Sequence, residues 1–173
     1  GIVVTLPGSG DGDFPVLDAS ANDAIVMTSN TVLSGFEINN ASGSAVFADG
    51  AENVEIRDSF INNAGERGIF LSEVSGSVIL FDNEISGAGD QGIFIENAEA
   101  GNNVEVTARR QTIDDARIGI AVAVGGGSVT DGNSAQIVDI EDATISNSDE
   151  QGLFLSSIEL GNQQVTFDGA TFI

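Results

Sequence analysis

Residues 68–71 read Gly68-Ile69-Phe70-Leu71, a glycine followed by three apolar residues, and this pattern recurs along the chain. The other copies are Gly92-Ile93-Phe94-Ile95, Gly119-Ile120-Ala121-Val122, Gly152-Leu153-Phe154-Leu155 and a looser Ser44-Ala45-Val46-Phe47. The glycines at positions 68 and 92 stand 24 residues apart, and spacings of 27 and 33 residues follow. All the extra residues fall in the connection that comes after the repeated segment. A repeat of this length predicts a solenoid in which each repeat forms one coil.

A second unit recurs in the same repeats. It consists of an apolar residue, usually an aspartate two positions later, and another apolar residue three positions after the aspartate. Its copies are Ile56-Arg57-Asp58-Ser59-Phe60-Ile61, Leu80-Phe81-Asp82-Asn83-Glu84-Ile85, Ile140-Glu141-Asp142-Ala143-Thr144-Ile145 and Phe167-Asp168-Gly169-Ala170-Thr171-Phe172. In the last copy the aspartate comes one residue early. Short alternating apolar runs separated by Asn, Asp, Gly or Ser predict three strands in each repeat and no helix. We therefore predict an all-β parallel solenoid of about six coils, each rising ~4.8 Å.

The Gly-Ile-x-Leu strand and the Asn-rich turns resemble the right-handed parallel β-helix family, the pectate-lyase-like superfamily. The resemblance covers residues 23–173, which leaves residues 1–22 as an irregular N-terminal coil. Because the last copy stops halfway round a coil, we expect the β-helix to continue beyond Ile173. The resemblance implies the fold, but the architecture serves polysaccharide lyases and hydrolases, phage tailspikes, autotransporter passengers and surface adhesins alike.

Composition excludes several kinds of chemistry. The 173 residues include 27 acidic and 5 basic residues, all five of them arginine, which gives a net charge of −22. His and Cys are absent, so an imidazole base, a thiol nucleophile and a disulfide framework are excluded. A surface this acidic repels nucleic acid and anionic lipid, and no apolar stretch approaches the roughly 20 residues of a membrane span.

Calcium is the metal that suits a chain whose ligands are all oxygen atoms. A glycine-rich segment carries Asp11 and Asp13, with Asp18 nearby, and a second segment carries Asp131 before Gly132. These four aspartates are the candidate calcium ligands, although neither segment follows an established calcium-binding spacing. Ordinary turns are the alternative, and no other cofactor is expected.

An apolar row is predicted on the outer surface. Within each Gly-Ile-Phe-Leu strand the first and third apolar residues point inward, so the middle residue faces outward. The predicted outward row comprises Val26, Val46, Phe70, Phe94, Ala121 and Phe154, of which Val46, Phe70, Phe94 and Phe154 form the predicted interaction stripe. Either the long connection at residues 123–137 covers this row, or it contacts another chain or a neighbouring segment of a larger protein.

The aspartates of the second unit also form a predicted column, in which they serve as turn residues, bridge calcium or act in catalysis. Arg109 and Arg110 stand between two such aspartates, Asp82 and Asp142, and are the one conceivable catalytic cluster. By resemblance, β-helix lyases use an Arg or Lys beside calcium and β-helix hydrolases use clustered aspartates. Here a single residue type, arginine, would have to supply every positive charge.

We therefore expect a rigid, non-catalytic module of an extracellular or cell-surface protein with a structural, filament-forming or adhesive role. Its expected partners are further copies of itself or neighbouring segments of a larger surface protein, with carbohydrate as a further candidate. The first alternative is a polysaccharide-active enzyme or a tailspike-like carbohydrate binder. The second is a protein that binds ice or a crystal surface, which needs ranked threonines, whereas Thr144 and Thr171 look isolated.

Overall fold

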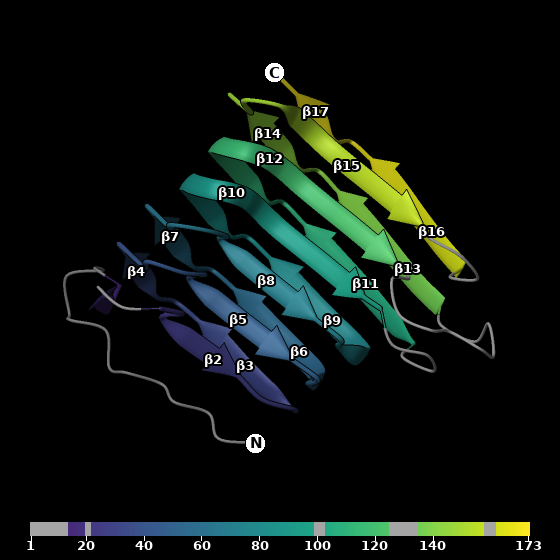
Figure 1. Cartoon of the computed structure of the whole chain (residues 1–173), viewed down its shortest axis with the longest axis horizontal. Coiled ribbons are helices and arrows are strands. Elements are labelled where there is room, and N and C mark those ends of the chain that lie inside the picture. The colour runs from purple at the N-terminus through teal and green to yellow at the C-terminus, as the bar shows by residue number, and fades with distance from the viewer. Residues whose placement is uncertain (1–13, 20–21, 99–102, 125–134, 158–161) are drawn as a thin grey trace.

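A computed structural model describes residues 14–19, 22–98, 103–124, 135–157 and 162–173. Short β-strands joined by tight turns wind into successive coils that stack along one axis (Figure 1). Every strand pairing among the described residues is parallel and joins neighbouring coils. The chain is therefore a parallel β-solenoid, as the repeats predict. None of the described residues forms a helix that could span a lipid bilayer.

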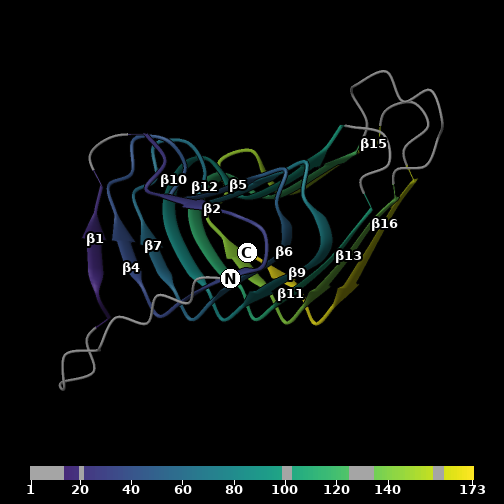
Figure 2. The ribbon, with the colours of Figure 1, turned by 90° about the horizontal axis from the view of Figure 1, so that it is seen from below.

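The strands form one sheet of 11 and one of six. One row of the larger sheet is β1 (Val16–Asp18), β4 (Glu37–Asn39), β7 (Phe60–Asn62), β10 (Glu84–Asn97), β12 (Thr112–Val124), β14 (Thr144–Ser146) and β17 (Thr171–Phe172). Its other row is β2 (Ile25–Met27), β5 (Val46–Asp49), β8 (Ile69–Ser72), again β10 and β12, and β15 (Gln151–Ser157). The six-stranded sheet is β3 (Thr31–Ser34), β6 (Glu52–Arg57), β9 (Ser75–Phe81), β11 (Val104–Arg109), β13 (Ala135–Glu141) and β16 (Asn162–Asp168). In Figure 2, β4 and β7 stand at one end of the coils and β13 and β16 near the other.

Residues at equivalent positions of the repeat lie directly above one another. Ile69 pairs with Ile93 and Phe70 pairs with Phe94, in the register that the 24-residue spacing predicts. Between β10 and β12 the register continues across the longer spacing, with Ile93 opposite Ile120. The equivalent apolar residues therefore stay opposite one another in the longer repeats, with one shift of register in β10 between Ala88 and Gln91.

The interior between the sheets is filled by stacked aliphatic side chains. Fully or almost fully buried columns run through all three rows, and examples are Ile38, Ile61, Ile85, Ile113 and Ile145, and Ile56, Leu80, Ala108 and Ile140. The small residues after the Asn-rich turns, Ala41, Ala64, Ala88 and Ala116, are buried too. Burying each apolar side chain contributes roughly 1.5–3 kcal/mol, so this continuous core is the main source of stability.

Asn and Asp mark the corners because the backbone there takes the left-handed conformation. Between the six-stranded sheet and the first row, the residues with positive φ are Gly35, Asp58, Asp82, Arg110, Asp142 and Gly169. At the next corner they are Asn40, Asn63, Gly87, Asp115 and Asn147. Glycine, asparagine and aspartate adopt this conformation more readily than other residues. The aspartates of this column therefore serve primarily as turn residues.

One detail of the predicted register was wrong, and the one-residue offset noted in the last copy is confirmed. In the early coils the period is one residue shorter, because Val46 lies opposite Ile69 and Phe47 lies opposite Phe70. Val46 is therefore fully buried and does not belong to the outward row, whose place Phe47 takes. In the last coil Asp168 pairs with Glu141, and Gly169 occupies the turn position beside Asp142.

Two further regions differ from expectation. β1 already pairs with β4 from Val16 onward, so the ladder begins before the boundary predicted at residue 23. Thr144 is not isolated, since it lies between Thr112 and Thr171 in one column. Toward the N-terminus, however, the same column continues as Glu84 and Phe60, so the threonines do not extend over the whole face.

Candidate functional site

An open groove of about 390 Å³ lies along the corner between the six-stranded sheet and the first row of the larger sheet. Its walls come from three successive coils and from a residue just outside the N-terminal end of β1: Phe14, Asp58, Phe60, Asp82, Glu84, Arg110 and Thr112. The rings of Phe14 and Phe60 are 5.0 Å apart and form its apolar side. Three carboxylates, one guanidinium and Thr112 form the rest of the wall.

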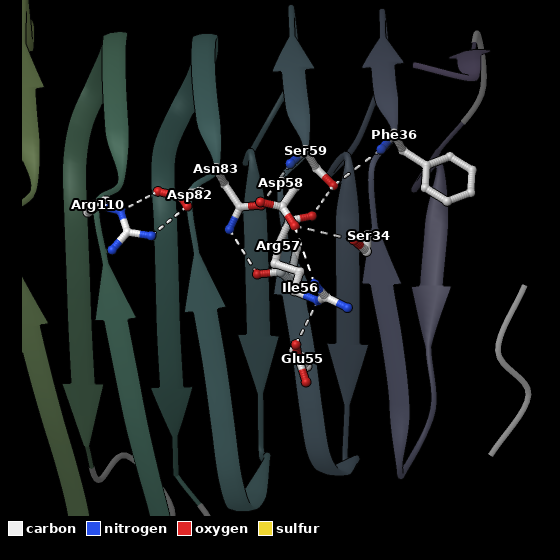
Figure 3. A network of polar contacts seen from close by, with 10 residues as sticks. All are labelled: Ser34, Phe36, Glu55, Ile56, Arg57, Asp58, Ser59, Asp82, Asn83 and Arg110. Atoms are coloured by element: carbon white, nitrogen blue, oxygen red, sulfur yellow. Dashed lines mark hydrogen bonds and ion pairs between the residues drawn. The ribbon is translucent and has the colours of Figure 1, made fainter. Parts of the chain in front are cut away.

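Arg110 and Asp82 are the central pair of the groove (Figure 3). Nε and Nη2 of Arg110 donate to the two carboxylate oxygens of Asp82 at 2.6 Å each, a two-point contact between neighbouring coils. The guanidinium also lies 4.0 Å from the centre of the Phe81 ring. Arg110 is thus held by a carboxylate and an aromatic face at once, a geometry that fixes its orientation.

The pair changes the acidity of both groups. The hydrogen bond from Arg110 holds the pKa of Asp82 below its ordinary value of 3.8, and partial desolvation opposes the shift. The same bond raises the pKa of Arg110, with smaller contributions from the negative charges of Asp142 and Asp58. Direct contact with Arg110 thus neutralises the negative charge of Asp82.

The lowered pKa of Asp82 predicts a pH effect. Because the unfolded carboxyl binds protons more readily than the folded one, the pair stabilises the fold above about pH 4. That stabilisation is lost as the pH falls through the lowered pKa of the folded state. An NMR titration of the Asp82 carboxyl carbon should give a midpoint below 3.8, which returns to the ordinary range in Arg110→Gln. The matched variant Arg109→Gln should leave it in place, and an ordinary midpoint in the unchanged protein would contradict the assignment.

The other arginines also form ion pairs, and most of these join neighbouring coils. Arg109 pairs with Glu141 at 2.9 Å, Arg67 contacts Glu66 at 3.1 Å and Asp90 at 3.9 Å, Arg117 bridges Asp90 and Glu150, and Arg57 pairs with Glu55 at 2.8 Å. All five arginines of the chain are therefore paired with carboxylates. In the predicted catalytic cluster, Arg110 and Asp82 come together in the groove, whereas Arg109 turns to Glu141.

Behind the groove wall lies a buried polar stack that the sequence analysis missed. Asn83 donates through Nδ2 to the carbonyl of Ile56 at 2.9 Å, and its Oδ1 accepts from the backbone N–H of Ser59 at 3.3 Å (Figure 3). Its Nδ2 also donates to Oε1 of Gln111 at 3.2 Å. Ser59, Asn83 and Gln111 have no solvent exposure. A signal was available in the sequence, because the equivalent position two coils later is Ala143, a small apolar residue that indicates an inward position.

The outward row of the larger sheet is the second candidate site. We call Val26, Phe47, Phe70, Phe94 and Phe154 the aromatic stripe. Phe47 and Phe70 stack with ring centres 5.2 Å apart, and Phe70 and Phe94 at 5.3 Å with an interplanar angle of 6°. Val26 is 63% and Phe154 40% exposed, while the three stacked rings are partly exposed. Ala121 occupies the same row but is buried.

The stripe is partly covered by its own neighbour. The guanidinium of Arg67 lies 4.3 Å from the ring centre of Phe70 and 5.3 Å from that of Phe94. Most of the connection at residues 123–137 lies outside the described residues, so covering of the stripe by that connection stays a prediction.

The predicted calcium ligands are largely untested. Asp11, Asp13 and Asp131 lie outside the described residues. Asp18 is exposed at the end of β1, where its Oδ1 accepts a hydrogen bond from Asn40 at 2.9 Å. In the described part of the chain, no group of three or more carboxylates is arranged to hold a metal ion. Calcium binding stays a prediction for the two glycine-rich segments.

Comparison with known proteins bears on the fold. No curated protein sequence and no solved structure matches the chain significantly. One family does, under the description "Right handed beta helix region", and the match covers residues 16–172. This span begins at the first paired strand and takes in every coil described above. The chain therefore belongs to the right-handed β-helix family.

Proposed function

We propose that the chain is a rigid, non-catalytic β-helix module of an extracellular structural, filament-forming or adhesive surface protein. The observation that carries this proposal is the pairing of all five arginines. Four of them, Arg67, Arg109, Arg110 and Arg117, contact carboxylates of a neighbouring coil. The positive charges that an enzyme would direct at an anionic polysaccharide are here used between coils.

The ladder itself supports a mechanical role. Parallel pairing joins each coil to the next along all three rows, so bending or stretching the rod must break several backbone hydrogen bonds together. Exposed ion pairs add little energy individually, but they hold the register of neighbouring coils. The remaining carboxylates keep the surface strongly negative and hydrated.

A turnover assay tests the non-catalytic role. Incubation with neutral and uronate polysaccharides should yield neither new reducing ends nor unsaturated products. Turnover that is lost in Asp82→Asn but retained in Asp49→Asn would overturn the proposal, because Asp82 lines the groove and Asp49 lies on β5, away from it. Electron microscopy of native material and protease treatment of intact source cells then test filament formation and surface location.

Carbohydrate binding is a second candidate function, favoured by the groove. Its wall combines carboxylate acceptors, the donor Arg110 and the apolar rings of Phe14 and Phe60, groups that contact the hydroxyl edges and the faces of sugars. A glycan array followed by titration should then show binding without cleavage. Loss of that binding in Phe60→Ser, with Phe154→Ser unchanged, would place the ligand in the groove.

A further inference from the structure

The aromatic stripe is an unusual surface for so acidic a protein. Its exposed side chains form a continuous apolar line across four coils, from Val26 through Phe47 and Phe70 to Phe94. Exposing apolar rings to water is unfavourable, and covering them with another apolar surface stabilises the protein. Arg67 covers only part of two of the rings.

Carboxylates border this line on both sides. Asp49 and Glu96 follow Phe47 and Phe94 by two residues in their strands, so they lie on the same outer face. Glu66, Asp90 and Glu150 lie on the other side, where Arg67 and Arg117 already contact them. An apolar line between acidic borders fits a partner that carries an apolar line between basic borders.

The spacing of the rings selects the secondary structure of the partner. Ring centres lie 5.2 and 5.3 Å apart, on coils that each rise ~4.8 Å. An α-helix presents one apolar side chain per turn every ~5.4 Å, whereas a strand presents same-face residues every ~6.8 Å and falls out of step within a few coils. A helix lying parallel to the solenoid axis therefore stays in step with the stripe.

We propose that the aromatic stripe is the docking surface for a basic amphipathic α-helix of a partner protein. The apolar residues of this helix lie over the edges and gaps of the stacked rings, and its Lys and Arg residues face Asp49 and Glu96. The inference rests on the proposed function only in assigning the module a role by surface contact.

Other occupants fit less well. A second copy would place two strongly negative faces together, and the chain's arginines are already paired. Sugar rings stack on aromatic faces, but the faces between Phe47, Phe70 and Phe94 are filled by one another. An anionic membrane would be repelled by the acidic borders.

The test uses two synthetic peptides of the same Leu and Lys composition. In one, leucines recur every three or four residues over about four helical turns, and in the other the order is scrambled. Fluorescence anisotropy should show the amphipathic peptide binding at least about tenfold more tightly than the scrambled one, with helical circular dichroism appearing on binding.

Two single variants and one double variant locate the site. Phe70→Ser should weaken amphipathic peptide binding about tenfold or more, while Ile79→Ser, on the six-stranded sheet and 39% exposed, should leave it unchanged. The double variant Asp49→Asn/Glu96→Gln leaves the rings intact and should reduce both the affinity and its dependence on salt.

Equal binding of both peptides, or undiminished binding by Phe70→Ser with a native melting curve, would overturn the proposal. Self-association that depends on Phe70 in sedimentation would overturn it in favour of a second copy. None of these outcomes affects the turnover assay, so this inference and the proposed function can fail separately.

Discussion

Replacing Gly92 by alanine is expected to lower the free energy of unfolding by about 3 kcal/mol. A methyl group at this position would lie 2.5 Å from Cγ2 of Ile113 and 2.7 Å from the carbonyl oxygen of Gly119. The carbonyl belongs to the paired backbone of the next coil and cannot move away without disturbing the ladder. Thermal melting followed by circular dichroism should therefore show a midpoint lowered by roughly 6–12 °C.

Gly50 supplies a control. It lies in the turn between β5 and β6, where an added Cβ meets nothing within 4 Å, and its φ is +59°. Asparagine accepts such a φ, so Gly50→Asn should melt close to the unchanged protein. Equal melting of Gly92→Ala and Gly50→Asn would show that the close approach between coils is not what requires glycine at position 92.

Replacing Asn83 by alanine should have a comparable effect through a different cause. The side chain is fully buried and makes three hydrogen bonds, to Ser59 N, Ile56 O and Gln111 Oε1. Its removal leaves buried polar partners unsatisfied and a cavity behind, which together cost about 3 kcal/mol or more. Urea unfolding should show a lower midpoint with an unchanged slope.

Asn62→Ala is the control for this second substitution. Asn62 donates to Asn39 Oδ1 at 3.0 Å but is only partly buried in β7, so water can replace its contact. Its loss should cost about 1 kcal/mol or less. If the two alanine variants unfold at the same urea concentration, the buried stack does not stabilise the fold as described.

Much of this architecture could be predicted because the repeats impose the same chemistry at the same place in each coil. Ile69 and Ile93 flank outward phenylalanines, and a period of two then assigns which side chains face the core. Aspartate and asparagine at the corners were recognisable as turn residues. Pairing of Arg110 with Asp82 also followed from their places in adjacent copies.

The errors arose where the pattern was chemically ambiguous. Val46 and Phe47 are both apolar, so alternation could not show which one faces the core, and Ser44 resembled the glycine that opens the later copies. Hydrogen bonds resolve the ambiguity, because Ala45 N donates to Arg67 O and Val46 N to Gly68 O. The groove depends on Phe14, which lies just before β1 and outside the recurring sequence units, so no spacing rule predicts its place in the wall.

The corner at which the longer repeats gain their residues suggests a use in protein engineering. β12 and β13 each keep their in-register neighbours, although ten residues separate Val124 from Ala135. Each doubling of such a connection adds only about 0.6 kcal/mol of closure entropy. Foreign peptides grafted at successive corners of this kind would be displayed one above another, at regular intervals of ~4.8 Å on a stiff support.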